Sequence, residues 1–334
     1  MPFPAPFENR GKEVLIAVNP KAGSGSRGEI IEQLVVKIEK AGLFPQVISD
    51  IDQIVLTAQA SLATHSLRAV VAAGGDGTIR LLADQLPPGT PLTILPLGTE
   101  NLLAKYFDFQ RNAAALCEIL TSGVEIQLDA GLAGNRLFTL MVGCGFDANV
   151  VHQVLNNRTG NINRWAYFKP IWDSVRTYAY PEMKVLFQPV AGEGISSSPG
   201  LSRQVLARFV YVVNLPRYAA GLSFSPTANG SDGLLNVVTF SGGGLWKGLQ
   251  YLTGVFLGRH EKFRDCKVFQ TKRLRIEPAS DTNSSQPDTG IPLQVDGDPA
   301  GELPIDIEVL PRRLTFLVSP RWAKRNPNAM ITTT

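Results

Sequence analysis

The sequence predicts a protein of two domains, an α/β domain built on a parallel sheet and, after it, an antiparallel β-sandwich domain. Three observations support this prediction. The chain has 334 residues, which is long for a single domain. Residues 12–129 alternate short apolar runs with amphipathic helical patterns, as expected for parallel strands joined by helices. Residues 130–318 hold many short apolar runs separated by turn residues, which is typical of antiparallel strands.

Strands and helices are expected to alternate through the first domain. Val14–Val18 is an uninterrupted apolar run and predicts a buried strand. Residues 29–40 carry apolar side chains three and four positions apart, which predicts an amphipathic helix. The other strands are expected at residues 45–49, 68–73 and 92–95, and the other helices at residues 53–64, 79–86 and 113–122.

The second domain is expected to consist mainly of strands. They are predicted at residues 136–142, 183–187, 205–213, 234–240, 274–277, 293–295, 306–309 and 314–318. The most apolar stretch, residues 245–257, is interrupted by a lysine, a glutamine and two glycines and is too short to span a bilayer. If the protein contacts a membrane, we therefore expect it to lie on the membrane surface.

The composition allows a large buried core and narrows the classes of partner. Apolar residues make up 44% of the chain and charged residues 18%. The formal net charge of +3 is too small to indicate nucleic-acid binding, whereas a slightly basic protein suits phosphate ligands or anionic lipid surfaces. The three dispersed cysteines have no metal-binding spacing and favour a reducing compartment, so we expect a cytoplasmic protein.

The most informative motif is the loop Gly74-Gly75-Asp76-Gly77-Thr78, which follows one predicted strand and precedes a predicted helix. Glycines in such a turn let the backbone N–H groups approach a phosphate, because no Cβ atom is in the way. A carboxylate beside a phosphate requires a cation or a sugar hydroxyl between them. Asp76 therefore predicts contact with a magnesium–nucleotide complex or a ribose. The alternative is a turn that only uses the local chemistry of an Asp-Gly pair.

A second glycine-rich loop follows the first strand. It contains a literal G-x-G-x-x-G pattern from Gly23, and Asp50 lies about where a ribose-binding acid would stand in a dinucleotide site. However, four residues separate the strand from Gly23, and a P-loop is excluded because Glu29 replaces the required lysine. The remaining interpretation of this segment is a phosphate-binding loop in which Lys21 or Arg27 neutralises the charge of the phosphate. The alternative is a solvated loop without a ligand.

A third loop, Leu97-Gly98-Thr99-Glu100-Asn101, follows the strand at residues 92–95. Thr99 or Glu100 could instead serve as the N-cap of the next helix. All three loops follow strands of one parallel sheet, and the carboxyl ends of such strands meet at one edge. The sequence therefore predicts that nucleotide phosphates bind at this edge.

These loops and several later segments resemble the diacylglycerol kinase catalytic domain family, which includes bacterial lipid kinases and the sphingosine and ceramide kinases. The resemblance covers residues 14–320, and the Gly-Gly-Asp-Gly-Thr motif alone is shared with NAD kinases. The ordered set of motifs is more specific than any one of them. The segments that carry it are Asn19–Gly23, Gly74–Thr78, Leu97–Asn101, Gly143–Ala148, Asn214–Pro216, Pro226–Leu235 and Val295–Asp298.

The resemblance implies a fold and an activity. The fold is an NAD kinase/diacylglycerol kinase-like parallel sheet, completed by residues 319–328, plus the β-sandwich. The activity is that of an ATP-dependent lipid kinase that uses Mg²⁺ and transfers the γ-phosphate to the hydroxyl of a diacylglycerol-like or sphingoid lipid. The implied nucleotide-binding residues are Asn19, Lys21, Gly23, Gly74, Gly75, Asp76, Gly77, Thr78, Gly98, Thr99 and Asn101.

The resemblance also implies a catalytic residue and a metal site. Asp296 matches the family's catalytic carboxylate, which accepts the proton of the lipid hydroxyl. The residues alone support a hairpin turn at Asp296 equally well. Asp232 and the carbonyl of Leu234 match two ligands of a structural Mg²⁺. The third ligand is a carboxylate in the family and is Asn229 here, whose amide oxygen binds Mg²⁺ more weakly.

The expected partners follow from the same resemblance: a lipid substrate and peripheral contact with a membrane, but no nucleic acid. The aromatic and basic segment at residues 164–172 is either part of a lipid mouth or core. The sequence leaves a homodimer open and does not identify the lipid. Two other functions remain: an NAD kinase-like phosphotransferase, and a nucleotide or lipid sensor, which the departures from the family at Leu102 and Asn229 leave open.

Overall fold

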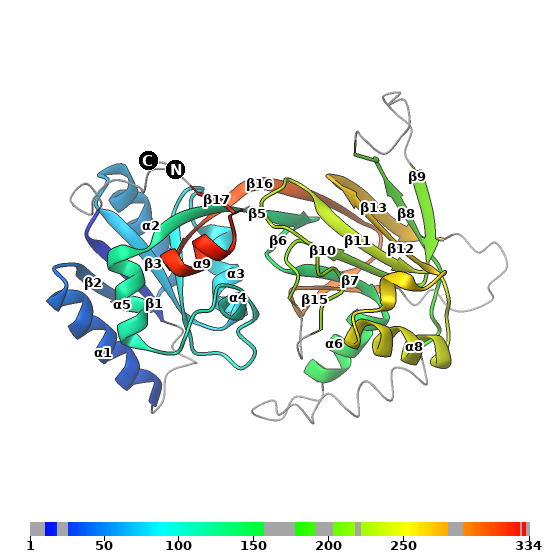
Figure 1. Cartoon of the computed structure of the whole chain (residues 1–334), viewed down its shortest axis with the longest axis horizontal. Helices are drawn as coiled ribbons and strands as arrows, with labels where there is room; N and C mark the ends of the chain where they lie inside the picture. The colour runs from blue at the N-terminus through cyan, green and yellow to red at the C-terminus, as the bar shows by residue number, and fades with distance from the viewer. Residues whose placement is uncertain are drawn as a thin grey trace. The chain divides into compact units, whose positions relative to one another are not determined.

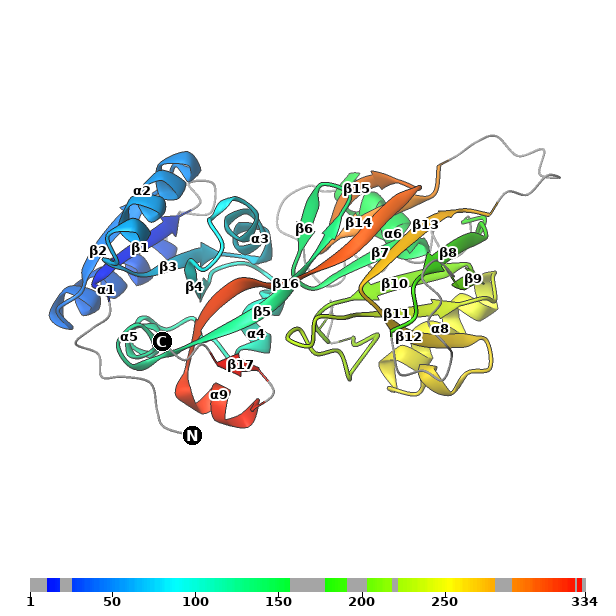
Figure 2. The ribbon, with the colours of Figure 1, turned by 90° about the horizontal axis from the view of Figure 1, so that it is seen from above.

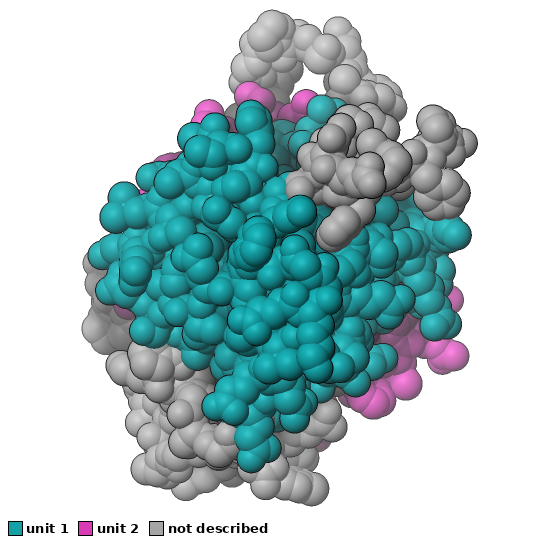
Figure 3. Space-filling model, turned by 90° about the vertical axis from the view of Figure 1, so that its left-hand side faces the viewer, with its two compact units in different colours: residues 1–130, 311–334 teal, residues 131–310 magenta. Residues whose placement is uncertain are grey.

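The computed structural model describes residues 11–18, 26–156, 178–190, 203–217, 222–279, 290–327 and 329–331. The chain folds into two compact units (Figure 1). Unit 1 comprises Met1–Ala130 and Pro311–Thr334, and its described residues form one continuous surface on the face that Figure 3 shows. Unit 2 comprises Gly131–Leu310. The segment that returns to unit 1 thus begins at Pro311, earlier than the predicted residue 319.

Unit 1 is built on a parallel sheet. Its strands are β1 (Glu13–Val18), β2 (Phe44–Ile48), β3 (Leu67–Gly74) and β4 (Pro91–Pro96), in the order β2-β1-β3-β4. β3 and β4 are buried at every position, as expected for strands covered on both faces. The end of β16 (Ile305–Val318) pairs in parallel with β4, so that Thr315 lies opposite Pro91.

Helices cover both faces of this sheet. They are α1 (Ser26–Lys40), α2 (Ile51–Ala63), α3 (Asp76–Gln85), α4 (Leu102–Tyr106), α5 (Ala113–Ser122) and α9 (Pro320–Arg325). Figure 2 shows α2 and α3 on one side of the sheet, and α1 packs with α5 on the other side. The short α9 is held by Trp322, whose indole N–H donates to the carbonyl of Tyr106 at 2.8 Å.

Unit 2 is a β-sandwich of antiparallel strands. One sheet has the order β12-β11-β10-β7-β14-β15, formed by Cys266–Thr271, Leu235–Phe240, Phe209–Val213, Met141–Gly145, Pro292–Val295 and Asp298–Glu302. The other contains the first part of β16 with β13 (Arg273–Pro278), β8 (Met183–Phe187) and β9 (Arg203–Ala207). Val210 and Val237 of the first sheet and Val185 and Ile276 of the second belong to one buried cluster. The predicted fold class is confirmed.

Several elements differ from the sequence prediction. The predicted strand at residues 136–142 is two strands, β6 (Arg136–Phe138) and β7, because the backbone breaks at residues 139–140. The predicted strand at 205–213 breaks at Arg208. The two strands expected at 306–309 and 314–318 form one continuous strand, β16.

Several elements were not predicted. They include β5 (Val124–Ala133), β12, β15, α6 (Phe146–Asn156), α8 (Leu245–Phe256), α9 and the two-residue β17 (Met330–Ile331). β5 was missed because the predicted domain boundary lay within it. Within the part of the chain that the structure describes, no helix is long and apolar enough to cross a membrane.

Candidate functional site

The parallel sheet of unit 1 has its topological switch point between β1 and β3. β1 connects through α1 to β2 on one side, whereas β3 connects through α3 to β4 on the other. In sheets of this type a ligand binds outside the carboxyl ends of the strands at that point. The loop after β1 lies outside the described residues, so the assignments of Asn19, Lys21 and Gly23 stay predictions.

A pocket of about 220 Å³ lies at this edge of the sheet. The ends of β1 and β2 and the starts of α2 and α3 form its walls, and Gly77 and Thr78 are among its lining residues. A Cβ atom added to Gly77 would meet nothing within 4 Å, so the space in front of this residue is open. Complete ligand pockets usually measure about 300–1,000 Å³, so this pocket is smaller than a complete ligand pocket.

The glycines after β3 and β4 bring two of the predicted loops into direct contact. A Cβ atom on Gly98 would lie 2.6 Å from the Cα atom of Gly75, and one on Gly74 would lie 2.3 Å from the Oγ1 atom of Thr78. The Leu97 N–H also donates to the Gly74 carbonyl at 2.9 Å. The sequence predicted these glycines for close approach to a ligand. The structure shows that Gly74 and Gly98 are also required for packing between and within the loops.

Asp76 joins the same two loops through its carboxylate. Its two oxygens accept hydrogen bonds from the N–H groups of Leu102, at 3.0 Å, and Leu103, at 3.1 Å. These are the first N–H groups of α4, so Asp76 caps a helix that begins 26 residues later in the chain. Burial raises the pKa of Asp76 above its ordinary value, and the two N–H groups oppose that shift. No local feature of the sequence predicts this role.

Asn101 shapes the third loop from within. Its Oδ1 atom accepts from the Gly98 N–H at 2.9 Å and its Nδ2 donates to the Gly98 carbonyl at 2.7 Å. Neither Thr99 nor Glu100 is the N-cap of α4, since Asn101 occupies that position and Asp76 supplies the capping oxygens. Glu100 instead forms an ion pair with Lys105.

Asp50, the acid of the dinucleotide alternative, lines the pocket at this edge of the sheet. Its carboxylate accepts from the Gln53 N–H at 2.8 Å and is the N-cap of α2. Gly28, the last glycine of the G-x-G-x-x-G pattern, lies inside α1 rather than in a loop. An N-cap explains an aspartate at this position without a ribose.

In unit 2, Asp296 and Gly297 form the two-residue turn between β14 and β15. Both have positive φ values, 49° and 85°, as a type I′ hairpin requires. Hence the hairpin geometry expected from the Asp-Gly pair is present. The side chain of Asp296 does more than the turn requires.

The Asp296 carboxylate accepts four hydrogen bonds at the break between β6 and β7. Oδ2 accepts from the Thr139 N–H at 2.7 Å and its hydroxyl at 3.0 Å, and Oδ1 accepts from Leu140 and Met141, both at 2.9 Å. A carboxylate has about four lone-pair positions, so these donors use all of them. Burial raises the pKa of Asp296, and the four donors oppose that shift. The catalytic role of Asp296 stays a prediction.

The predicted metal ligands lie in one turn, and the magnesium site stays a prediction. The Asn229 amide oxygen accepts from the Ser231 hydroxyl at 2.9 Å, and one oxygen of Asp232 accepts from the Leu234 N–H at 3.0 Å. Asp232 is the only carboxylate of this turn, and Mg²⁺ favours a nearly octahedral set of oxygens. The described residues contain no cluster of three His, Cys, Asp or Glu side chains, but the predicted set has one carboxylate and is not a cluster of that kind.

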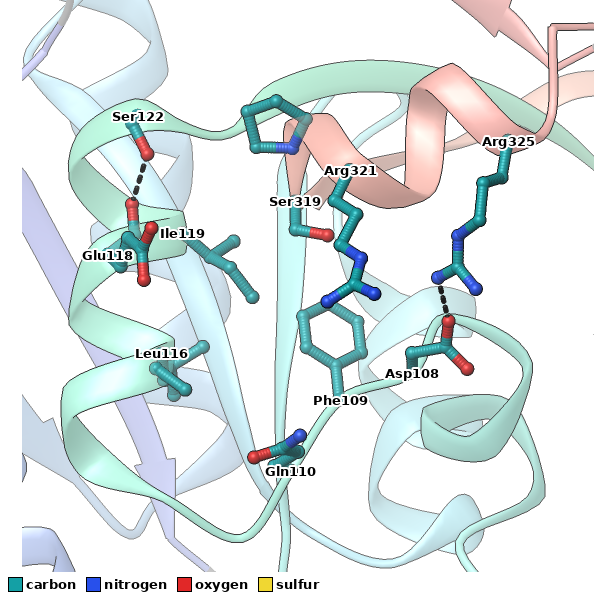
Figure 4. Close-up of a pocket in the computed structure, with 12 residues that line it drawn as sticks. Asp108, Phe109, Gln110, Leu116, Glu118, Ile119, Ser122, Ser319, Arg321 and Arg325 are labelled. Carbon is teal, nitrogen blue, oxygen red and sulfur yellow. Dashed lines mark hydrogen bonds and ion pairs between the residues drawn. The ribbon is translucent and has the colours of Figure 1, made fainter.

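A larger pocket of about 700 Å³ lies elsewhere in unit 1, with α5 on one side and α9 on the other (Figure 4). Arg325 pairs with Asp108 at its rim. Its lining contains none of the residues predicted for the nucleotide or for catalysis. The predicted lipid mouth at residues 164–172 lies outside the described residues.

Comparison with known proteins identifies relatives over nearly the whole chain. The sequence matches the diacylglycerol kinase catalytic domain over residues 13–133 and the YegS C-terminal NAD kinase beta sandwich-like domain over residues 140–318. A protein named diacylglycerol kinase from Mycobacterium tuberculosis is 26% identical, covering 91% of this chain and 94% of the relative. One of the same name from Staphylococcus aureus is 22% identical, covering 91% of each.

Solved structures support the same fold. A Bacillus anthracis structure aligns with a TM-score of 0.67 at 20% identity, covering 93% of this chain and 96% of that chain. Another, described as a diacylglycerol kinase from the same organism, aligns with a TM-score of 0.61 at 18% identity, covering 93% and 98%. At such identity the alignments establish the fold and not the substrate.

Proposed function

The chain belongs to the diacylglycerol kinase catalytic domain family, and on that premise we propose that it is a lipid kinase. It transfers the γ-phosphate of ATP, bound with magnesium as the substrate complex, to the hydroxyl of a diacylglycerol-like or sphingoid lipid. The observation that carries the proposal is the meeting of two glycine loops, at Gly75 and Gly98, at the carboxyl edge of the parallel sheet.

The proposal places phosphates of ATP at the start of α3. Gly75 is the N-cap of this helix and has no side chain to cap its first N–H groups. Backbone N–H groups at a helix start favour a phosphate, and the open space at Gly77 gives it room. Asp76 lies in the same turn, but both of its oxygens accept N–H groups of α4, so much of its charge is directed there.

We assign the proton-accepting role to Asp296. Three of its four hydrogen-bond donors are backbone N–H groups, and only the Thr139 hydroxyl can rotate away. A lipid hydroxyl that replaces the Thr139 hydroxyl at Oδ2 would be able to give up its proton as its oxygen attacks the γ-phosphate. Asp298, two residues later, is the competing carboxylate for this role.

Gly77 offers a test of nucleotide binding that spares the fold. We expect Gly77→Glu to fold normally, because the position is open and an acidic residue is favourable in the first turn of a helix. Its negative charge should weaken ATP binding by about tenfold or more. Gly77→Gln is the matched neutral control and should weaken binding less. Calorimetry with ATP measures both, and equal affinities for the two variants would contradict the phosphate position.

The activity itself is tested by incubating the protein with labelled ATP, magnesium and a panel of lipids, with NAD as a separate acceptor. We expect label in a lipid phosphate. Label transferred to NAD would favour the NAD kinase-like alternative. ATP binding without transfer to any acceptor would favour a sensor.

A further inference from the structure

Helix α8 of unit 2, drawn in yellow in Figure 1, is apolar on its outer face. Trp246 is 79% exposed and Phe256 is 74% exposed, and Leu249, Leu252 and Leu257 are exposed with them. At 100° per residue, these five side chains fall within about 140° of the helix circumference, and the polar residue among them is Thr253. An apolar surface of this kind marks a site of contact with another body.

The opposite face of α8 is firmly attached to unit 2, so the outer face is presented rigidly. Tyr251 is buried, and its hydroxyl donates to the Asp265 carboxylate at 2.5 Å. Lys247 donates to the same carboxylate at 2.6 Å. At Gly254 an added Cβ atom would lie 2.4 Å from the ring of Phe263, so the helix packs closely against the residues that follow it.

Basic side chains follow the apolar face in the sequence. Residues 245–268 carry five cationic and two anionic side chains, a net charge of +3, which equals the net charge of the whole chain. One of the five, Lys247, is paired with Asp265. The other four, all exposed, are Arg259, Lys262, Arg264 and Lys267.

We infer that the outer face of α8 is the surface by which this protein docks on an anionic lipid bilayer. Trp, Phe and Leu side chains enter the boundary between headgroups and acyl chains, and flanking Lys and Arg side chains meet anionic headgroups. A second copy of the chain is a poorer occupant, because a twofold contact would bring the same basic residues toward each other. The inference rests on the proposed function only in expecting a bilayer-resident substrate.

A pocket of about 560 Å³ at the start of α8 fits this orientation. Gly243, Gly244 and Leu245 form one side of it, and Tyr178, Tyr180 and Arg208 line the rest. A bilayer in contact with α8 would lie beside this pocket.

The test measures sedimentation of the full chain with phosphatidylcholine vesicles that contain phosphatidylglycerol. Trp246→Ser with Phe256→Ser should lower vesicle binding by about tenfold for each residue. The matched control is Phe44→Ser with Leu56→Ser, two large apolar residues of unit 1 that are 61% and 67% exposed. The control should bind as the unchanged protein does.

The electrostatic part is tested with Lys262→Gln and Lys267→Gln. Each should lower binding to the anionic vesicles by about fivefold and leave binding to pure phosphatidylcholine unchanged. Lys37→Gln with Lys40→Gln, exposed on α1, is the control. Absence of vesicle binding by the unchanged protein, or equal losses in the α8 and control variants, overturns the inference. So does a dimer that the α8 variant converts to a monomer with its vesicle binding unchanged.

A separate assay distinguishes this inference from the proposed function. With a short-chain diacylglycerol in nonionic detergent, the α8 variant should phosphorylate the lipid at the rate of the unchanged protein. If the unchanged protein phosphorylates no lipid, the proposed function fails, and the sedimentation result still decides whether α8 docks on vesicles.

Discussion

Two Asp-Gly pairs, Asp76-Gly77 in unit 1 and Asp296-Gly297 in unit 2, use the same dipeptide for different purposes. Asp76 is the first residue of α3, and its carboxylate accepts two N–H groups of α4. Asp296 has a left-handed φ of 49° in a hairpin, and its carboxylate accepts four donors at the break between β6 and β7. In both pairs the carboxylate holds a segment that is distant in sequence.

The number of donors determines what each carboxylate can still bind. Among the described residues Asp76 accepts two hydrogen bonds, which leaves lone pairs for a ribose hydroxyl or a magnesium–nucleotide complex. Asp296 can accept a substrate proton only if a present donor leaves, and the Thr139 hydroxyl is the mobile one. The two Asp-Gly pairs are therefore expected to differ in how much folding free energy is lost when the carboxylate is removed.

The largest effect is expected for Asp296→Asn. In one orientation the amide nitrogen would face the N–H groups of Leu140 and Met141, and in the other it would face the N–H group and hydroxyl of Thr139. We therefore expect the free energy of unfolding to fall by about 2–4 kcal/mol. Loss of a general base should also lower the rate of phosphoryl transfer by about 10²–10⁴-fold. Thermal denaturation and steady-state kinetics measure the two effects.

Two controls separate these roles of Asp296. Thr139→Val removes only the mobile donor and should cost about 1 kcal/mol of stability while preserving most of the activity. Asp298→Asn should leave both properties nearly unchanged. A stable Asp296→Asn protein with full turnover would contradict both the structural and the proton-accepting role of Asp296. Loss of turnover in Asp298→Asn would instead identify Asp298 as the general base.

A smaller effect is expected when the loops beside Asp76 are forced apart. Gly98→Ala places a methyl group against the backbone of Gly75 and should destabilise the protein by about 1–3 kcal/mol. Gly77→Ala is the matched control, because its methyl group meets open space in a helix and should stabilise slightly. Similar denaturation midpoints for both variants would show that the Gly75–Gly98 contact is not needed.

The smallest effect on stability is expected for Asp76→Ala. Loss of the cap on α4 should cost about 1–2 kcal/mol. ATP affinity should fall as well if the carboxylate contacts the nucleotide. Asp76→Asn retains one acceptor oxygen, so its denaturation midpoint should lie between those of the unchanged protein and Asp76→Ala. An unchanged ATP dissociation constant in calorimetry would restrict Asp76 to the capping role.

Local patterns predicted the elements of this fold better than the partners of particular side chains. The uninterrupted apolar run at Val14–Val18 identified β1, because a strand buried on both faces must be apolar throughout. The break of a predicted strand at residues 139–140 had no local signal, since its cause, Asp296, is more than 150 residues away. Likewise, nothing in the Thr99–Glu100 pair showed that Asp76 would supply the cap of α4.

By itself the sequence determined the fold class, most strands and helices of unit 1, the two loops that follow β3 and β4, and the family, because these depend on apolar periodicity and on short motifs along the chain. Only the tertiary structure decided that Gly98 lies against Gly75, that Asp296 has four donors, and that α8 turns an apolar face outward. Each of these depends on which distant segments meet. A residue's burial and hydrogen-bond partners are properties of that packing and not of its neighbours in sequence.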